Sequence, residues 1–271
     1  MRRLIIALTA LFVMSYVQAA QVDTVLVNSR SMQKDIKTVV IIPDVAAEKP
    51  CPVIYLLHGH GNDYSGWIRV KPNLPQIADE KGIIFICPDG ERSWYWDSPL
   101  NKNVRYETFI SSELIAYVDS HYKTIARREG RAITGLSMGG HGAMWNGLRH
   151  SDVFSAAGST SGGVDIRPFP KNWEMSVQIG EKAKYPENWE KYTVINLVPT
   201  LRKDQIALIF DCGDSDFFLE VNKNYHEALL KQGIDHDFIT RPGNHDSQYW
   251  NNSIDYQILF FWKHFLKMKA L

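Results

Sequence analysis

The stretch ITGLSMGGHGAMW, residues 133–145, decides the fold of this chain. It contains four glycines, and a serine, Ser137, stands between Gly135 and Gly139. Each glycine inside a helix costs about 1 kcal/mol relative to alanine, so an ordinary helix does not carry this many. A strand pattern over residues 128–137 leads into the serine, and a helical pattern over residues 141–150 leaves it. The stretch therefore predicts a sharp strand-to-helix turn, in which glycine lets the two elements approach closely.

Strand and helix patterns alternate on both sides of this turn. Two strands are expected first, at residues 22–29 and 34–43, and buried strands then follow at 51–59, 83–90, 154–162, 206–213 and 236–243. Helical patterns cover residues 73–82, 106–122, 217–233 and 256–268. This alternation predicts a mostly parallel sheet with helices on both faces. Residues 164–204 are rich in Pro, Trp and Lys, and we expect them to form an insertion that acts as a lid or wall over a site.

The N-terminal 19 residues have the pattern of a secretory signal peptide. A basic start is followed by the apolar run LIIALTALFVMSYV, and Val17 and Ala19 provide small residues for cleavage after position 19. The alternative is an uncleaved anchor, but a spanning helix needs about 20 apolar residues and this run is shorter. A lipoprotein would have a Cys at the cleavage site. We therefore expect a secreted or periplasmic protein whose single domain covers residues 20–271.

Charge and cysteine content exclude several classes of protein. Without Arg2 and Arg3 the chain has 28 basic and 30 acidic residues, and no basic patch indicates nucleic-acid binding. A small or neutral partner is expected instead. The three cysteines are too few for a disulfide framework, and Cys87 and Cys212 stand in apolar runs that predict buried thiols.

A Gly-x-Ser-x-Gly motif at a strand-to-helix junction is typical of a nucleophile elbow, although the motif alone also fits a structural turn. Parallel sheets form their sites at the carboxyl ends of strands, where Ser137 would lie. In such folds the acid follows the serine and the histidine comes last. Asp214 and Asp216 follow the strand at 206–213, and His245 follows the strand at 236–243. We expect Ser137 to be the nucleophile, His245 the general base and one of the two aspartates its partner.

Other polar residues have competing interpretations. His141 is one helical turn beyond the serine and is expected to pack or to line the pocket wall. His58 and His60 form a His-x-His pair that could bind a metal, but no third ligand is evident. Asp246 is interpreted as a surface or turn residue, and Asp211, inside a strand, as a hydrogen-bonded structural group.

The backbone and the aromatic residues supply further expectations. An oxyanion hole needs two N–H donors, which we assign to Met138, the residue after the nucleophile, and His60, in the loop after the strand at 51–59. Trp94 and Trp96, in the stretch SWYW, and Trp67 are candidates for stacking on a sugar or an aromatic acyl group; the alternative is packing under a long loop. Other tryptophans with the same ambiguity are Trp173 and Trp189.

The chain resembles the esterase D-like α/β-hydrolases over roughly residues 35–265. The stretches that carry the resemblance are LLHGHGNDYSGW, GLSMGGHGA, CGDSD and GNHDSQYW. That group includes the feruloyl and acetyl esterases of carbohydrate esterase family 1, S-formylglutathione hydrolases and mycolyltransferases. The family spacing Cys-Gly-x-x-Asp favours Asp216 over Asp214, and Gly-x-His-x-x-x-x-Trp matches Gly243, His245 and Trp250, as in the feruloyl branch. The resemblance implies an α/β-hydrolase fold that needs no metal or cofactor.

Together these observations predict a secreted serine esterase that removes acyl groups, such as acetyl or feruloyl, from polysaccharides. An acyltransferase with the same residues is the alternative nearest to it. An S-formylglutathione hydrolase-like thioesterase fits less well, because that branch usually has a different histidine segment. A protease is a further alternative. A carbohydrate-binding homologue without catalysis would have no need for all three groups.

Overall fold

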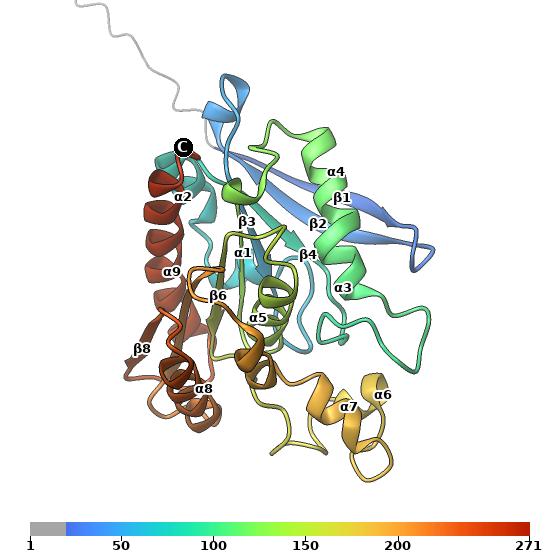
Figure 1. Ribbon diagram of the computed structural model, residues 1–271. Helices are drawn as coiled ribbons and strands as arrows, with labels where there is room; N and C mark the ends of the chain where they lie inside the picture. Colours follow the sequence, from blue (N-terminus) through green and yellow to red (C-terminus); the bar gives the residue numbers. More distant parts are fainter. Residues whose placement is uncertain (1–19) are drawn as a thin grey trace, which may run out of the picture.

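The computed structural model describes residues 20–271, and the segment predicted to be a signal peptide, residues 1–19, lies outside them. The described chain forms one eight-stranded sheet in the order β1-β2-β4-β3-β5-β6-β7-β8 (Figure 1). The strands are β1 (Gln21–Ser29), β2 (Lys34–Ile42), β3 (Val53–Leu57), β4 (Ile84–Pro88), β5 (Arg131–Gly135), β6 (Ala156–Thr160), β7 (Ala207–Gly213) and β8 (Asp237–Arg241).

Strand direction follows the sequence pattern. The first two strands pair antiparallel, β2 pairs antiparallel with β4, and all other neighbours are parallel. Every residue of β3, β4, β5 and β6 is buried, as expected for strands covered on both faces. This arrangement confirms the predicted α/β-hydrolase fold. It brings the carboxyl ends of β3 to β8 to one edge of the sheet.

Helices cover both faces of the sheet (Figure 1). Their bounds are α1 (Gly66–Val70), α2 (Leu74–Lys81), α3 (Tyr106–Thr108), α4 (Leu114–His121), α5 (Met138–Arg149), α6 (Met175–Ile179), α7 (Pro186–Lys191), α8 (Leu219–Gln232) and α9 (Ser247–Lys267). Apolar side chains of α1, α2 and α9 share one buried cluster with the sheet, and those of α4, α5 and α8 share another. None of the helices in the described part of the chain is long and apolar enough to cross a bilayer.

The segment predicted as one helix over residues 106–122 is a continuous helical run with a π-helical stretch in it. The run passes from α3 through the π-helical turn Phe109–Glu113 into α4. The apolar positions that defined the pattern, Phe109, Leu114, Ile115 and Val118, are all buried. The sequence period therefore located the helix but gave no sign of the wider turn.

Residues 164–204 connect β6 to β7 through α6, α7 and the 3₁₀ segment Val194–Thr200. Trp189 and Tyr192 of this insertion are buried, and the Tyr192 ring stacks on Trp145 of α5 with centroids 5.4 Å apart. The predicted insertion is thus a folded part of the domain. Among the described cysteines, Cys51, Cys87 and Cys212 are all buried free thiols.

Glu107 joins α3 to α5, and its ionisation should make the fold sensitive to acid. Burial opposes the charge of Glu107, but hydrogen bonds from His150, Arg149 and Trp145 outweigh it and lower its pKa to about 2. A depressed folded-state pKa gives stability that is present above the unfolded value of about 4.3 and is lost as pH falls toward 2. We therefore expect the free energy of unfolding to fall between pH 6 and pH 2 by on the order of 3 kcal/mol more in the wild type than in Glu107→Gln. Urea unfolding across this range measures the difference, and parallel curves would contradict the expectation.

Candidate active site

Ser137 occupies the sharp turn between β5 and α5 that the opening stretch predicts. Its backbone has φ 55° and ψ −117°, a conformation that a non-glycine residue rarely adopts. A Cβ on Gly135 would lie 2.4 Å from the Gly139 backbone, and one on Gly139 would lie 2.1 Å from the Leu57 carbonyl oxygen. Neither position can hold a larger residue without moving backbone atoms. The glycines therefore allow the contact between strand and helix that holds Ser137 at the carboxyl edge of the sheet.

Ser137, His245 and Asp216 form a hydrogen-bonded chain. His245 Nε2 is 2.9 Å from Ser137 Oγ, and His245 Nδ1 is 2.8 Å from Asp216 Oδ2. Because a carboxylate only accepts, Nδ1 carries the hydrogen and Nε2 is free to accept the serine proton. The Asp216 side chain is fully buried and the His245 side chain is 14% exposed, so the imidazole is the end of the pair that solvent reaches. The three positions predicted from β5, β7 and β8 thus meet at one edge.

The neighbouring aspartates have other partners. Asp216 also accepts from the N–H of Phe218 at 2.8 Å, which fixes the carboxylate. Asp214 is exposed and accepts from the N–H of Gly243 at 3.3 Å, bracing the loop that carries the histidine. Asp246 is exposed, as expected for a surface or turn residue, and it also caps α9 by accepting from the N–H of Tyr249 at 2.9 Å.

Asp211 is the buried structural group that its place inside a strand predicts. It accepts from the Gln257 amide at 2.6 Å and also from the Ser253 hydroxyl, both in α9. Burial raises the pKa of its carboxyl group. Asp211 therefore ties β7 to α9 and makes no hydrogen bond to His245.

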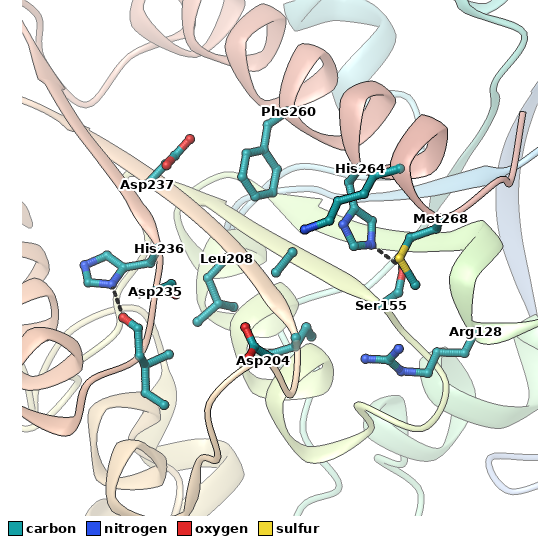
Figure 2. A pocket seen from close by; sticks show the side chains of 14 residues that line it. Arg128, Ser155, Asp204, Leu208, Asp235, His236, Asp237, Phe260, His264 and Met268 are labelled. Atoms are coloured by element: carbon teal, nitrogen blue, oxygen red, sulfur yellow. Dashed lines mark hydrogen bonds between the residues drawn. The ribbon is translucent and has the colours of Figure 1, made fainter.

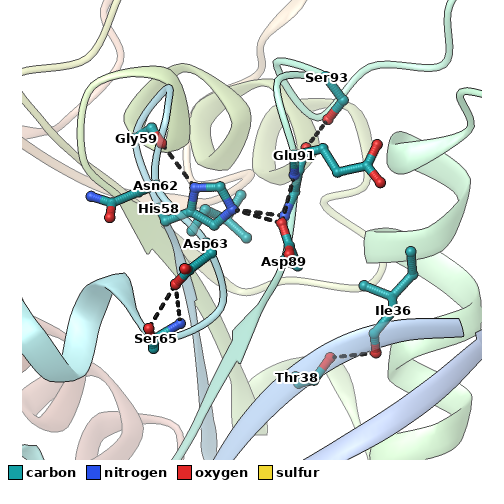
Figure 3. Close-up of polar contacts among 12 residues, drawn as sticks. Ile36, Thr38, His58, Gly59, Asn62, Asp63, Ser65, Asp89, Glu91 and Ser93 are labelled. Atoms are coloured by element: carbon teal, nitrogen blue, oxygen red, sulfur yellow. Dashed lines mark hydrogen bonds and ion pairs between the residues drawn. The ribbon is translucent and has the colours of Figure 1, made fainter.

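The loop after β3 lies against Ser137. A Cβ on Gly59 would be 3.4 Å from Ser137 Cβ. The buried His58 ring donates from Nδ1 to the Gly59 carbonyl at 2.8 Å and accepts from the N–H of Gly90 at 2.8 Å (Figure 3). In a trans peptide the C=O and N–H point in opposite directions, so the N–H of His60 points away from the His58 ring.

Two backbone donors beside Ser137 have no intramolecular acceptor. Within residues 20–271 no hydrogen bond is made by the N–H of His60 or by that of Met138, the first residue of α5. The first N–H groups of a helix have no partner inside it and are available to an anion. These are the donors that the sequence predicts for an oxyanion hole.

The histidine pair does not form a metal site in the structure. The His58 ring is buried beneath the loop, whereas the His60 ring lies 3.3 Å from a carboxylate oxygen of Glu174 in the insertion. In the described chain no group of three or more His, Cys, Asp or Glu residues is placed to hold a metal ion. Burial lowers the pKa of His60, although its contact with Glu174 acts in the opposite direction.

Sequence comparison assigns the family. The family model named Esterase, described as "Putative esterase", matches residues 29–261. The chain belongs to this esterase family. The acetyl esterase of Caldicellulosiruptor saccharolyticus is 26% identical over 253 residues, covering 83% of this chain and 92% of that protein.

Two further comparisons agree with this assignment. The S-formylglutathione hydrolase of Rattus norvegicus is 24% identical over 265 residues, covering 83% of this chain and 92% of that enzyme. A solved ferulic acid esterase has a TM-score of 0.78 at 29% identity, covering 91% of this chain and 98% of the other. The comparisons confirm the resemblance to esterase D-like hydrolases and support a carboxylic ester hydrolase.

The tryptophans predicted to stack on substrate are buried in this esterase. Trp67, Trp94 and Trp96 are at most 1% exposed. Each indole N–H has a protein acceptor: the Leu57 carbonyl for Trp67, the Trp173 carbonyl for Trp94 and the His141 ring for Trp96. The stacking interpretation is therefore wrong for all three in this structure, because no face of these rings is open to a ligand.

His141 is a packing residue between these rings. It is fully buried, accepts from the Trp96 indole at 2.8 Å and donates to the Gly163 carbonyl at 2.8 Å. Burial lowers its pKa to about 4, so the ring is neutral at pH 7. Of the two roles left open for His141, the structure supports packing.

Trp96→Ala should therefore act on stability. Truncation of a buried aromatic commonly costs about 3–5 kcal/mol because a cavity remains. We expect urea unfolding to show a loss of this size, and a smaller loss for Trp173→Ala, whose ring is only partly buried. An unchanged midpoint for Trp96→Ala, together with altered ester selectivity, would restore the substrate-binding interpretation.

The imidazole of His245 has three aromatic neighbours, Phe217, Phe218 and Trp250, of which Phe217 is the exposed one. Phe217, directly after Asp216, is 50% exposed, and its ring centroid is 4.2 Å from that of His245. Trp173 of the insertion stacks on Phe217 with centroids 5.4 Å apart. We call Phe217 and Trp173 the aromatic wall. The sequence signal for the aromatic wall is the Phe-Phe pair at 217–218, which the helical pattern assigns to the start of a helix.

A separate cavity of about 440 Å³ lies at the other edge of the sheet (Figure 2). Ser155, Ala207 and Asp237 line it, at the amino ends of β6, β7 and β8. Ser137 and its partners follow the carboxyl ends of their strands, so this cavity is not part of the candidate site.

Proposed function

We propose that this protein is a secreted serine esterase that hydrolyses acyl esters, such as acetyl or feruloyl esters, on polysaccharides. The observation that carries the proposal is the hydrogen-bonded chain from Asp216 through His245 to Ser137. In this proposal His245 takes the proton of Ser137 as the hydroxyl attacks the ester carbonyl, and it later gives that proton to the leaving alcohol. The buried Asp216 holds the imidazole tautomer and balances its positive charge.

The free N–H groups of His60 and Met138 support an oxyanion hole for the tetrahedral intermediates. Donors already fixed before reaction stabilise the developing negative charge without reorganisation, and losing one such donor typically costs about 100- to 1,000-fold in rate. Collapse of the first intermediate breaks the ester C–O bond and leaves an acyl group on Ser137. Water activated by His245 then releases the acid and restores the serine.

The aromatic wall supports a substrate with a flat or bulky group. Phe217 presents its ring at the imidazole, where a leaving group or acyl chain must pass, and Trp173 of the insertion extends this aromatic surface by stacking on Phe217. A sugar face or a phenolic ring can stack on such a surface. The predicted signal peptide supports the location outside the cytoplasm, where polysaccharide esters occur.

The class of substrate is tested by a panel of esters. Purified protein is assayed with p-nitrophenyl esters of increasing acyl length, methyl ferulate, acetylated xylan and S-formylglutathione. We expect hydrolysis of the carbohydrate or feruloyl esters with higher kcat/KM than of the thioester. A preference for S-formylglutathione would favour the thioesterase. Acyl transfer to an added sugar in preference to water would favour the acyltransferase.

Phe217→Ala should change selectivity among these esters. Loss of one stacking ring removes about 0.5–1.5 kcal/mol beyond the buried area, which corresponds to a rise of roughly 2- to 12-fold in KM for methyl ferulate. The ratio of kcat/KM for methyl ferulate to that for p-nitrophenyl acetate measures the effect. Leu259→Ala is the matched control, because Leu259 is 40% exposed on α9 away from the imidazole. An equal ratio in the two variants would remove Phe217 from substrate recognition.

A further inference from the structure

A second hollow adjoins the site on the side of the His60 loop. It has a volume of about 450 Å³ and is formed by three segments: the loop after β3, the loop after β4 and α6 of the insertion. The residues that line it include Asn62, Asp89, Glu91, Arg92 and Gln178. We call this hollow the polar groove.

The polar groove is close to Ser137. Asn62 is held in a turn by its N–H bond to the Gly59 carbonyl at 3.1 Å, and Gly59 packs against Ser137. Glu174 joins the two regions, because it accepts from Arg92 of the groove at 2.8 Å and contacts His60 at 3.3 Å. A substrate extending from the serine over the His60 loop would therefore enter the groove.

The groove exists because the insertion is anchored there. The Ser98 hydroxyl donates to the Gln178 carbonyl at 2.6 Å, and the Gln178 amide donates to the Arg92 carbonyl at 3.3 Å. Together with the Glu174–Arg92 ion pair, these bonds fix α6 against the loop after β4. The groove is therefore formed without substrate, and binding there would not have to order the insertion.

The hydrogen-bonding groups of the polar groove suit the hydroxyl groups of a sugar. Asp89 and Glu91 offer carboxylate oxygens at 26% and 56% exposure, and Arg92 and the Asn62 amide offer donors (Figure 3 shows all but Arg92). A hydroxyl both donates and accepts, so it can use either kind of group. Lys34 pairs with Glu91 at 2.7 Å and Glu174 pairs with Arg92 at 2.8 Å, so three carboxylates stand against two cations. This excess of negative charge disfavours an anion. Val104 is the apolar side chain in the lining, so an aromatic acyl group has little to stack on.

We propose that the polar groove binds the hydroxyl-rich part of the substrate, one or more sugar residues next to the esterified one. This inference rests on the proposed function, since it assigns the acyl-bearing polymer a place beyond the Ser137 site. The groove and the aromatic wall then contribute different selectivities: the groove recognises the sugar chain, and the wall recognises a ring at the reacting ester.

The test compares one substrate that reaches the groove with one that does not. Acetylated xylo-oligosaccharides and p-nitrophenyl acetate are assayed with the wild type, Asn62→Ala and Glu91→Ala. Each lost hydrogen bond should lower the ratio of kcat/KM, oligosaccharide over p-nitrophenyl acetate, by about 3- to 10-fold. Val177→Ala is the control: Val177 precedes Gln178 on α6, is 67% exposed and does not line the groove, so its ratio should equal that of the wild type.

The outcomes separate the inference from the proposed function. If the wild type hydrolyses both substrates and neither groove variant changes the ratio, the groove is not a sugar subsite although the esterase assignment stands. If the wild type hydrolyses p-nitrophenyl acetate but leaves the acetylated oligosaccharides intact, both the proposed polysaccharide function and the groove inference are wrong. A lowered ratio in both variants, with Val177→Ala like the wild type, supports the inference.

Discussion

Ser137→Ala is expected to lower kcat for p-nitrophenyl acetate by about four to six orders of magnitude. Removal of a catalytic serine that works together with a histidine base typically causes a loss of this size. The reason is chemical: alanine has no oxygen to attack the carbonyl, while the oxyanion donors of the neighbouring backbone remain. The fold should survive, because alanine has the same Cβ as serine and occupies the same backbone conformation, φ 55°. Steady-state kinetics measure the loss, and thermal melts of the same sample check the fold.

His245→Ala provides the companion variant. It removes the base but keeps the serine, so its loss should be similar in size and not additive with that of Ser137→Ala. A Ser137→Ala enzyme that retained a tenth of the wild-type rate would show that another residue carries the reaction.

Asp216→Asn should lower kcat by about three to four orders of magnitude, whereas Asp214→Asn should change it by less than about tenfold. Asp216 accepts from His245 Nδ1, and an amide at this position can present its NH₂ group and hold the wrong tautomer. Asp214 accepts only from the backbone of Gly243 and from Ser215, bonds that an amide oxygen can also make. Both variants replace an aspartate by an asparagine, at positions two residues apart, so each is the control for the other. The opposite ranking would transfer the acid role to Asp214.

The position of the site could be predicted because it depends on short sequence motifs and on where each strand ends. A glycine on each side of Ser137 is required wherever β5 and α5 meet so closely, and that requirement is visible in thirteen residues of sequence. Asp216 follows β7 and His245 follows β8. Because the carboxyl ends of parallel strands lie at one edge of the sheet, both residues are expected at the same edge as Ser137. The same reasoning located the loop after β3, whereas the insertion was predicted from its composition.

The roles of aromatic residues were not predictable in the same way. Whether Trp94 and Trp96 face solvent depends on what covers them, and the cover is residues 164–204, which have little sequence pattern. Tyr192 from that insertion contacts the Trp96 ring, with centroids 5.5 Å apart. The aromatic wall was missed for a related reason: Phe217 and Trp173 are 44 positions apart and meet only when the insertion folds back.

The insertion lies against several parts of the candidate site. Its Tyr192 packs on Trp96, and its Trp173 stacks on Phe217, the residue whose ring lies beside the imidazole. Its helix α6 is anchored beside the polar groove by the Ser98–Gln178 hydrogen bond. Sequence change within residues 164–204 could alter substrate preference while Ser137, His245 and Asp216 keep their positions, because their hydrogen bonds involve no residue of the insertion.

Identification of the acylated residue during turnover shows directly whether Ser137 is the nucleophile. The wild-type protein is mixed with p-nitrophenyl acetate, quenched in acid within the first turnovers, digested and analysed by peptide mass spectrometry. If Ser137 is the nucleophile, we expect one acetyl group on the peptide that contains it, fragment ions that place this group on the serine oxygen, and no acetyl group in Ser137→Ala. An acetyl group on a different residue, or rapid turnover with no acylated peptide, would contradict this assignment.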